Sequence, residues 1–189
     1  MAKLRKAVAY RTIERPYTRI SKYKSKSFIR MTPHIKITRF DMGEPQKEYQ
    51  YTVILIPKSG IQIRQESIES ARMAALRVIE GALGKSGYHF KIKTFPFHIL
   101  RENPLASGAG ADRMSTGMQK SFGKPIGVTC QVKKGKHLFE IKVNKENIGI
   151  AKQSLTRAIS KMPCSFSVVI VDNNAPRGKK VQIQVPNAE

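Results

Sequence analysis

The alternation of hydrophobic and polar residues along the chain predicts seven β-strands. Segment 34–40, HIKITRF, alternates over most of its length, and segment 51–56, YTVILI, is apolar and β-branched; both patterns are typical of strands. The other expected strands cover residues 61–64, 88–101, 127–132, 137–143 and 166–171. Residues 41–48 are expected to form a turn-rich connection, and Pro96 predicts a bulge or an edge break within its strand.

Two short turns predict that neighbouring strands pair as hairpins. PKSG connects the expected strands 51–56 and 61–64, and KKGK connects the expected strands 127–132 and 137–143. Tight turns of this length commonly join antiparallel partners. We therefore expect two hairpins.

Two segments have the periodicity of amphipathic helices. In 67–84 apolar residues recur at spacings of three and four, with Ser67 as the expected cap and Gly84 as the expected stop. The expected buried stripe consists of Ile68, Ala71, Ala75, Val78, Ile79 and Ala82. A second helix is expected over 147–162, capped by Asn144 or Asn147. This order of elements predicts an α+β domain over 32–172, a two-layer α/β sandwich of mainly antiparallel strands with two helices.

The charge of the chain sets it apart from most globular proteins. Its 189 residues contain 35 Lys and Arg against 13 Asp and Glu, a formal net charge of +22. Such self-repulsion opposes the compact state and is unusual for a freestanding enzyme. A polyanionic partner is therefore expected: nucleic acid, an anionic membrane surface or an acidic protein.

The basic residues are dense in the first 31 residues, where Glu14 is the only acid. Aromatic residues are interleaved with them: Tyr10, Tyr17, Tyr23 and Phe28. We expect residues 1–31 to form an extended arm that cannot bury enough apolar surface to fold alone. Rings can stack on bases while Lys and Arg meet phosphates, which favours contact with nucleic acid over a merely solvated tail. Residues 173–189 are expected to form a polar C-terminal tail.

Membrane and extracellular classes are disfavoured. No apolar run approaches the roughly 18 residues that a spanning helix needs, and the basic N-terminus lacks the apolar region of a signal peptide. The two cysteines, Cys130 and Cys164, have no CxxC spacing. We expect them to be buried thiols in a reducing, intracellular compartment.

No motif supports a nucleotide-using or RNA-modifying enzyme. GALGKS at 81–86 has two residues between its glycines where a phosphate loop needs four, and it ends a helix instead of opening one. GAGAD at 108–112 lacks the third glycine of a dinucleotide fingerprint. The four histidines occur singly and are expected to be structural or RNA-facing: His34, His89, His98 and His137. His89 and His98 could approach each other across a hairpin. We expect no metal, no cofactor and no catalytic set.

The segment from Ser107 to Gly127, SGAGADRMSTGMQKSFGKPIG, interrupts this pattern with five glycines. Glycine permits backbone conformations closed to other residues and close approach to another backbone. Basic residues in the segment can contact phosphates, and Met114, Met118 and Phe122 can lie against a base or a sugar. Long loops inside compact domains are usually functional or disordered. We interpret this one as a mobile probe, over 103–126, that enters folded nucleic acid; a bare flexible loop is the alternative.

The segments FPFHILREN and GAGADRMSTGMQKSFGKPIG resemble the signature of the archaeal and eukaryotic family of large-subunit ribosomal protein ten, counterpart of bacterial large-subunit protein sixteen. SIESARMAALRVIEGALGKSGYHFKI also matches the family pattern, and the resemblance spans about 35–171. It implies a non-enzymatic component of the large ribosomal subunit in the cytoplasm. The implied partners are 23S-type rRNA, 5S rRNA, neighbouring ribosomal proteins, and tRNA in the aminoacyl and peptidyl sites, with no membrane.

The candidate site residues follow from the basic arm, the loop and this resemblance. The expected rRNA-binding residues are Lys3, Arg5, Lys6, Arg11, Arg15, Arg19, Lys22, Lys24, Lys26, Arg30, Arg101, Lys120 and Lys124. The residues that the resemblance implies to lie nearest the tRNA acceptor ends are Gly108, Gly110, Ala111, Asp112, Arg113, Met114 and Gly117. A freestanding RNA- or DNA-binding regulator fits the charge equally well and remains the alternative.

Overall fold

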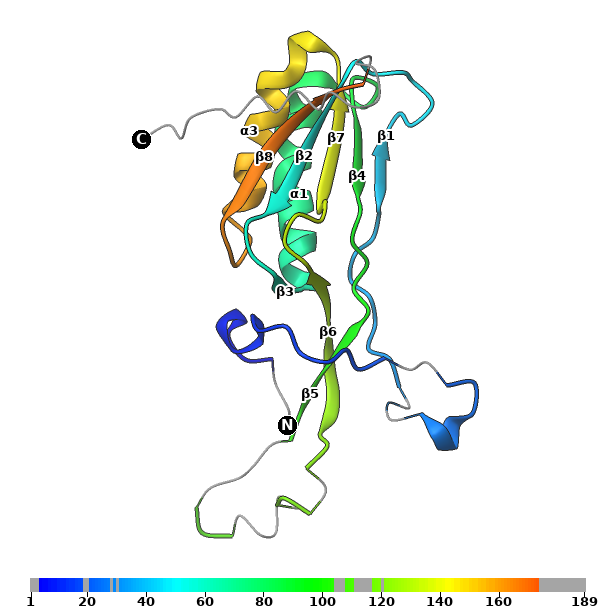
Figure 1. Ribbon diagram of the computed structural model, residues 1–189, viewed down its shortest axis with the longest axis vertical. Coiled ribbons are helices and arrows are strands. Elements are labelled where there is room, and N and C mark those ends of the chain that lie inside the picture. The colour runs from blue at the N-terminus through cyan, green and yellow to red at the C-terminus, as the bar shows by residue number, and fades with distance from the viewer. Residues whose placement is uncertain are drawn as a thin grey trace.

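The computed structural model describes residues 4–18, 21–27, 29, 31–103, 108–110, 117–119 and 121–173. Figure 1 shows an elongated molecule with a helix-backed sheet at one end and a long hairpin at the other. The expected α+β class is confirmed, and every strand pair is antiparallel. The two helices, α1 (Gln65–Leu83) and α3 (Ile148–Ile159), lie side by side on the same face of the larger sheet.

The strands form two sheets. The larger sheet has the order β1 (Asp41–Gly43), β4 (His89–Ile92), β7 (Phe139–Val143), β2 (Tyr51–Pro57) and β8 (Phe166–Asp172). The smaller sheet has the order β3 (Ile61–Arg64), β6 (Lys124–Val132) and β5 (His98–Glu102). Three short 3-10 turns complete the described structure: η1 (Ala7–Tyr10), η2 (Lys24–Lys26) and η3 (Lys145–Asn147).

The core lies between the helices and the larger sheet. Small residues let the helices approach closely, and the Ser154 hydroxyl donates to the Ala75 carbonyl across their contact at 2.9 Å. On the sheet side, the Phe90 and Phe139 rings pack edge to face with centroids 5.2 Å apart. Of the expected α1 stripe, Ile68, Ala71, Ala75 and Ile79 are buried. Val78 is half-buried and Ala82 is exposed.

Both predicted hairpins are wrong, since the turns lead from one sheet to the other. β2 pairs with β7 and β8, while β3 pairs with β6. In the same way, β6 belongs to the smaller sheet and β7 to the larger one. The expected strand 88–101 is also divided, around Pro96, into β4 and β5. With the connection from β3 through α1 to β4, four connections cross between the sheets, and backbone bonds such as Lys93 N–H to Leu138 O (2.9 Å) join the sheets.

The predicted strand 34–40 is wrong as well, since the segment forms no strand and bonds to a side chain instead. The buried Gln65 side chain accepts a hydrogen bond from Lys36 N–H (3.0 Å) and donates one to His34 O (3.1 Å). This amide takes the place of a neighbouring strand, so the segment is not part of a ladder. Pairing begins only at β1, where a turn was expected.

The helix ends differ from prediction at the N-termini. α1 begins at Gln65, ahead of the expected cap Ser67, and Arg64 occupies the cap position without a side-chain bond. Neither Asn144 nor Asn147 makes a side-chain cap bond. The Gly84 stop is confirmed, with φ of 66° and its N–H bonded to Glu80 O. α3 ends at Ile159, and residues 160–162 continue as a turn.

A buried ion pair ties α1 to the segment before β1. Arg72, on α1, bonds through its guanidinium to both carboxylate oxygens of Glu69. The same guanidinium donates to Thr38 Oγ1 (3.2 Å) and to Met42 Sδ (3.5 Å). Because Arg72 is only 8% exposed, its charge depends on these partners.

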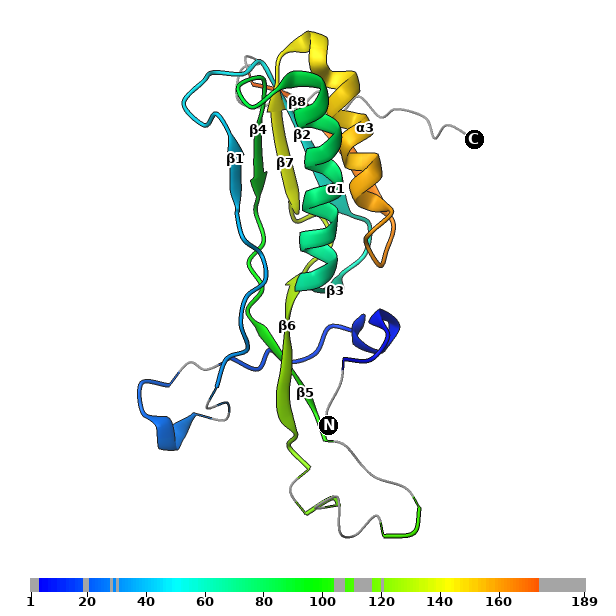
Figure 2. The same cartoon turned by 180° about the vertical axis from the view of Figure 1, so that it is seen from behind.

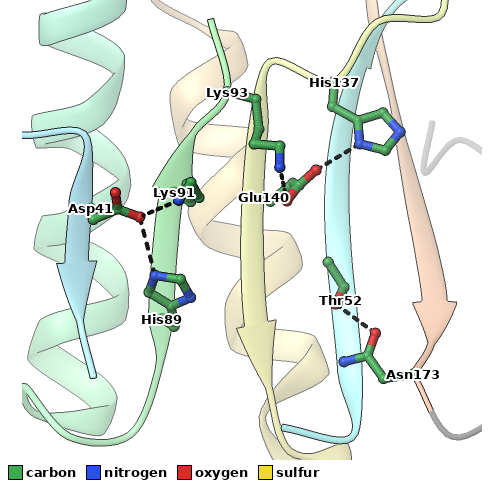
Figure 3. A network of polar contacts seen from close by, with 8 residues as sticks. All are labelled: Asp41, Thr52, His89, Lys91, Lys93, His137, Glu140 and Asn173. Atoms are coloured by element: carbon green, nitrogen blue, oxygen red, sulfur yellow. Dashed lines mark hydrogen bonds and ion pairs between the residues drawn. The ribbon is translucent and has the colours of Figure 1, made fainter. Parts of the chain in front are cut away.

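Polar contacts follow the face of the larger sheet that the helices leave uncovered (Figure 3). Asp41 Oδ1 lies 3.1 Å from Lys91 Nζ and 3.3 Å from His89 Nε2. Glu140 pairs with Lys93 and His137. His89 on β4 and His98 on β5 lie in different sheets and do not form the expected cross-hairpin pair. This face is therefore organised by alternating charges within the protein.

Candidate nucleic-acid interface

The N-terminal arm is docked on the smaller sheet. Ile99 N–H donates to Tyr17 O (3.0 Å), and Gln62 N–H donates to Arg11 O (3.0 Å). The Gln131 side chain adds a bond to Glu14 O (2.8 Å). Figure 1 shows the arm crossing β5 and β6. The arm thus uses β3, β5 and β6 to satisfy backbone groups that it cannot pair by itself.

His98 fixes the centre of the docked arm. Its Nδ1 accepts a hydrogen bond from Tyr17 N–H at 2.9 Å, which requires the proton of the neutral ring to be on Nε2. The ring is fully buried. Burial lowers the pKa of His98, while nearby Glu14 raises it and Arg101 lowers it further. The ring is therefore held in the neutral form that can accept this bond.

Arg101 joins the arm to the base of the glycine-rich loop. Its guanidinium carbon lies 3.8 Å from the centroid of the Tyr17 ring and 3.9 Å from that of the Phe122 ring. Nη1 donates to Phe122 O at 2.6 Å. The two rings meet edge to face, with centroids 5.9 Å apart. One side chain from β5 therefore holds two segments that are distant in sequence.

The base of the loop is closed by backbone geometry. Asn103 Nδ2 donates to Gly117 O at 3.1 Å, which brings the two sides of the loop together. Gly123 has φ of +82°, and a Cβ there would lie 2.9 Å from the Glu102 carbonyl carbon. Only glycine satisfies both the left-handed φ and this close approach.

Replacing Gly123 by alanine is expected to cost more stability than replacing Gly110. Both glycines have nearly the same positive φ, +82° and +80°, but a Cβ at Gly110 would meet nothing within 4 Å. The free-energy cost of holding alanine at a positive φ is therefore the same at both positions. The clash at Gly123 should add about 1 kcal/mol or more to the loss in unfolding free energy there. Chemical denaturation of the two variants measures the difference. Equal losses would show that the loop base shifts freely.

The structure places most of the expected rRNA-binding residues at one end of the molecule. The exposed members there are Arg5, Lys6, Arg11, Arg15, Lys22, Lys26 and Lys124. Arg5 also pairs with Glu102 of β5 at 3.1 Å, a second link between arm and hairpin. Arg101 is half-buried and committed to the ring contacts described above. Lys3, Arg19, Arg30, Lys120 and the side chain of Lys24 lie outside the described residues.

The expected tRNA-proximal residues are described only in part. Gly108, Gly110 and Gly117 all have positive φ, which their residue type permits. Gly108 and Gly110 are exposed. Ala111, Asp112, Arg113 and Met114 lie outside the described residues.

No group of three or more His, Cys, Asp or Glu within the described residues could hold a metal ion. Both cysteines are free; Cys130 is buried as expected, whereas Cys164 is half-buried, and burial raises both pKa values. Within the same residues, neither helix is long and apolar enough to cross a bilayer.

Sequence reasoning did not find the partners of the docked arm. Gln131, Gln62 and His98 hold it, and no local pattern marks a glutamine or a histidine in a strand as a receptor for a distant backbone. The aromatic residues of the arm were a usable signal, since the Tyr17 ring contacts Arg101 of β5.

Comparison with known proteins identifies the family of the chain. The family described as Ribosomal protein L16p/L10e matches residues 15–169. The large ribosomal subunit protein uL16 of Methanococcus maripaludis is 44% identical over 168 residues, covering 88% of this chain and 94% of the relative. The protein of the same name from Archaeoglobus fulgidus is 39% identical over 161 residues, covering 85% and 89%. The match takes in both sheets, both helices and the glycine-rich loop, and the chain therefore belongs to the L16p/L10e family of ribosomal proteins.

Proposed function

We propose that the chain is a structural, non-enzymatic constituent of the large ribosomal subunit that binds rRNA through the arm and the loop base. The observation that carries this proposal is the docking of the arm on the hairpin. Arg101 and the Arg5–Glu102 pair hold the two segments together, so that their basic residues share one end of the molecule. A single basic surface formed from two segments suits a folded RNA better than a single phosphate.

The affinity in this proposal comes from phosphate neutralisation. Each Lys or Arg that meets a phosphate releases condensed counterions, which makes binding fall as salt rises. The basic surface is formed by the arm together with the hairpin on which it docks, and not by one helix or ribbon alone. It presents shape and charge to RNA tertiary structure, as is common in recognition of structured RNA.

The family resemblance supports a more specific placement. We infer that the body binds near the 5S rRNA and the aminoacyl-tRNA site of a 23S-type subunit. The ends of β5 and β6 that carry the loop lie at the pole opposite the helices (Figure 2). From there the loop projects towards the tRNA acceptor ends and helps to order the tRNA sites, in contact with neighbouring ribosomal proteins in the cytoplasm.

Sedimentation of a cell extract tests this function. The protein is detected by antibody across a sucrose gradient before and after a wash at about 0.5 M salt, which weakens each phosphate contact. We expect it to remain with the large subunit after the wash. A protein found at the top of the gradient, or spread over many transcripts, would instead identify a freestanding RNA- or DNA-binding regulator.

Deletion of residues 107–118 is expected to leave the fold intact and to impair tRNA accommodation or subunit maturation. The bond between Asn103 and Gly117 shows that the two sides of the loop are close enough for a short connection. The melting temperature should change by about 2 °C or less, because no described core residue lies in the deleted segment. Normal translation by subunits that carry the deleted protein would contradict the proposed role of the loop.

A further inference from the structure

A groove of about 550 Å³ lies between the docked arm and the base of the loop. Its lining includes Arg15, Tyr17, Thr18, Lys26, Ser27 and Phe122. The first five come from the arm, and Phe122 comes from the segment before β6. A volume of this size falls within the range that proteins use to hold small ligands.

The groove combines flat apolar surface with positive charge. Phe122 is 40% exposed although Arg101 covers part of its ring, so ring surface remains available. Tyr17 stands at 89° to that ring and completes an aromatic corner. Arg15 and Lys26 are exposed beside it. Among the described lining residues there is no carboxylate, so an anionic ligand meets no repulsion from them.

The hydroxyl groups of the groove add polar contacts of a suitable kind. Ser27 Oγ already donates to Ile29 O at 3.0 Å, which leaves its oxygen free to accept a bond from a ligand. Ser21 and Thr18 offer further hydroxyls on the same wall. Such groups suit the amino, imino and ribose hydroxyl groups of a nucleotide.

We propose that this groove receives one unstacked nucleotide of RNA. The base lies against the exposed surface of the Phe122 ring, outside the corner that Arg101 fills, and the flanking phosphates meet Arg15 and Lys26. Proteins recognise RNA loops and bulges by stacking splayed-out bases on aromatic side chains, with basic residues along the backbone. The inference rests on the proposed rRNA binding and adds to it a site, a ligand class and named residues.

The groove is preorganised for this ligand. Arg101 contacts both rings and bonds the backbone of Phe122, so the aromatic corner is rigid before RNA arrives. The arm wall is fixed in the same way by the Tyr17 bonds to His98 and Ile99. Binding therefore does not have to order either wall.

Photocrosslinking of the full-length protein tests the site. The probe is a single-stranded RNA hexamer that carries one 4-thiouridine, and the crosslinked peptide is identified by mass spectrometry. We expect the crosslink in the peptides that contain Tyr17 or Phe122. Phe122→Ala should reduce its yield about tenfold, as expected for loss of one stacked base, whereas Phe122→Tyr, which keeps the ring, should preserve it. Phe97→Ala is the control, because Phe97 is similarly exposed at 38% and lies outside the groove lining.

Salt dependence tests the phosphate contacts separately. Each contact to single-stranded RNA contributes about 0.7 to the slope of log K against log salt. Arg15→Gln combined with Lys26→Gln should therefore lower the slope for the hexamer by about 1.4, twice that value. An unchanged slope would overturn the assignment of these two residues.

The outcomes separate this inference from the proposed function. A protein that stays on the large subunit, but whose Phe122→Ala variant crosslinks like the wild type, overturns the groove and leaves rRNA binding in place. Loss of the protein from the subunit fraction overturns the proposed function itself. Competition by free uridine monophosphate as strong as by the hexamer would overturn the RNA assignment in favour of a mononucleotide site.

Discussion

Replacement of Arg101 by methionine is expected to release the arm and the loop base together. The guanidinium contacts the Tyr17 and Phe122 rings at 3.8 and 3.9 Å and donates to Phe122 O. Two cation–π contacts and one charge-assisted hydrogen bond contribute roughly 3 kcal/mol together. Methionine fills similar space but supplies neither the charge nor the donor.

Hydrogen exchange measures this release directly. The amides of Tyr17 and Ile99 are the reporters, because they donate to His98 Nδ1 and to Tyr17 O across the junction. A loss of about 3 kcal/mol corresponds to exchange about 100-fold faster at these two amides. Arg157→Met on the exposed side of α3 removes the same charge and should leave them unchanged. Native protection in Arg101→Met would show that the backbone bonds alone hold the arm.

Replacement of Glu69 by alanine is expected to cause the largest loss of stability among the charged residues. It leaves the Arg72 guanidinium buried with only Thr38 and Met42 as partners. Removing one partner of a buried pair costs about 3–5 kcal/mol, mainly because the other charge is uncompensated. Denaturation in urea at neutral pH measures the change. Glu66→Ala, which breaks the more exposed pair with Lys36, is the control and should cost less than about 1 kcal/mol.

The same pair predicts a dependence of stability on pH. The hydrogen bond from Arg72 lowers the pKa of Glu69 below its ordinary value of 4.5, against an opposing effect of burial. A carboxyl whose pKa is depressed in the folded state stabilises the fold above its unfolded pKa and loses that effect as pH falls through the folded value. The difference in stability between wild type and Glu69→Ala should therefore shrink below about pH 4.5. A difference that stays constant to pH 2.5 would contradict this origin.

Local patterns were sufficient for the helices and for most strand positions. The three-and-four spacing around Ile68 and Ala75 gave the correct helix face, because a buried stripe on one helix is a property of that helix alone. β2, β3 and β8 were expected within one residue of their observed bounds for a similar reason. The high positive charge was enough to predict that the arm and the loop base take part in the interface. It did not show where either of them lies in the fold.

Pairing between strands could not be predicted in the same way. β2 and β3 are joined by a short turn, yet Pro57 lies opposite Phe166 while Ile61 lies opposite Val132. The partners are about 70 to 110 residues away, so no local sequence feature specifies them. Segment 34–40 could not be predicted for a different reason. It has the residue pattern of a strand, but it bonds to the side chain of Gln65 instead of to a neighbouring strand.

The candidate interface was predictable in its residue types and not in its geometry. Arg101 was expected to bind rRNA, but its guanidinium is engaged by Tyr17 and Phe122 within the protein. The contact joins residues 17, 101 and 122, and only the fold brings them together. The groove beside these residues likewise exists only because the fold brings distant segments together.

Lysine footprinting of isolated large subunits tests the central claim that the arm and loop base form the RNA-binding end. The protein is acetylated with a small reagent, free and within the subunit, and each lysine is quantified by mass spectrometry. We expect Lys6, Lys22, Lys26 and Lys124 to be protected in the subunit more strongly than Lys145 and Lys161, which are exposed near the two ends of α3. Arm and loop-base lysines that react as fast in the subunit as in the free protein, with protection confined to the α3 end, would contradict the account.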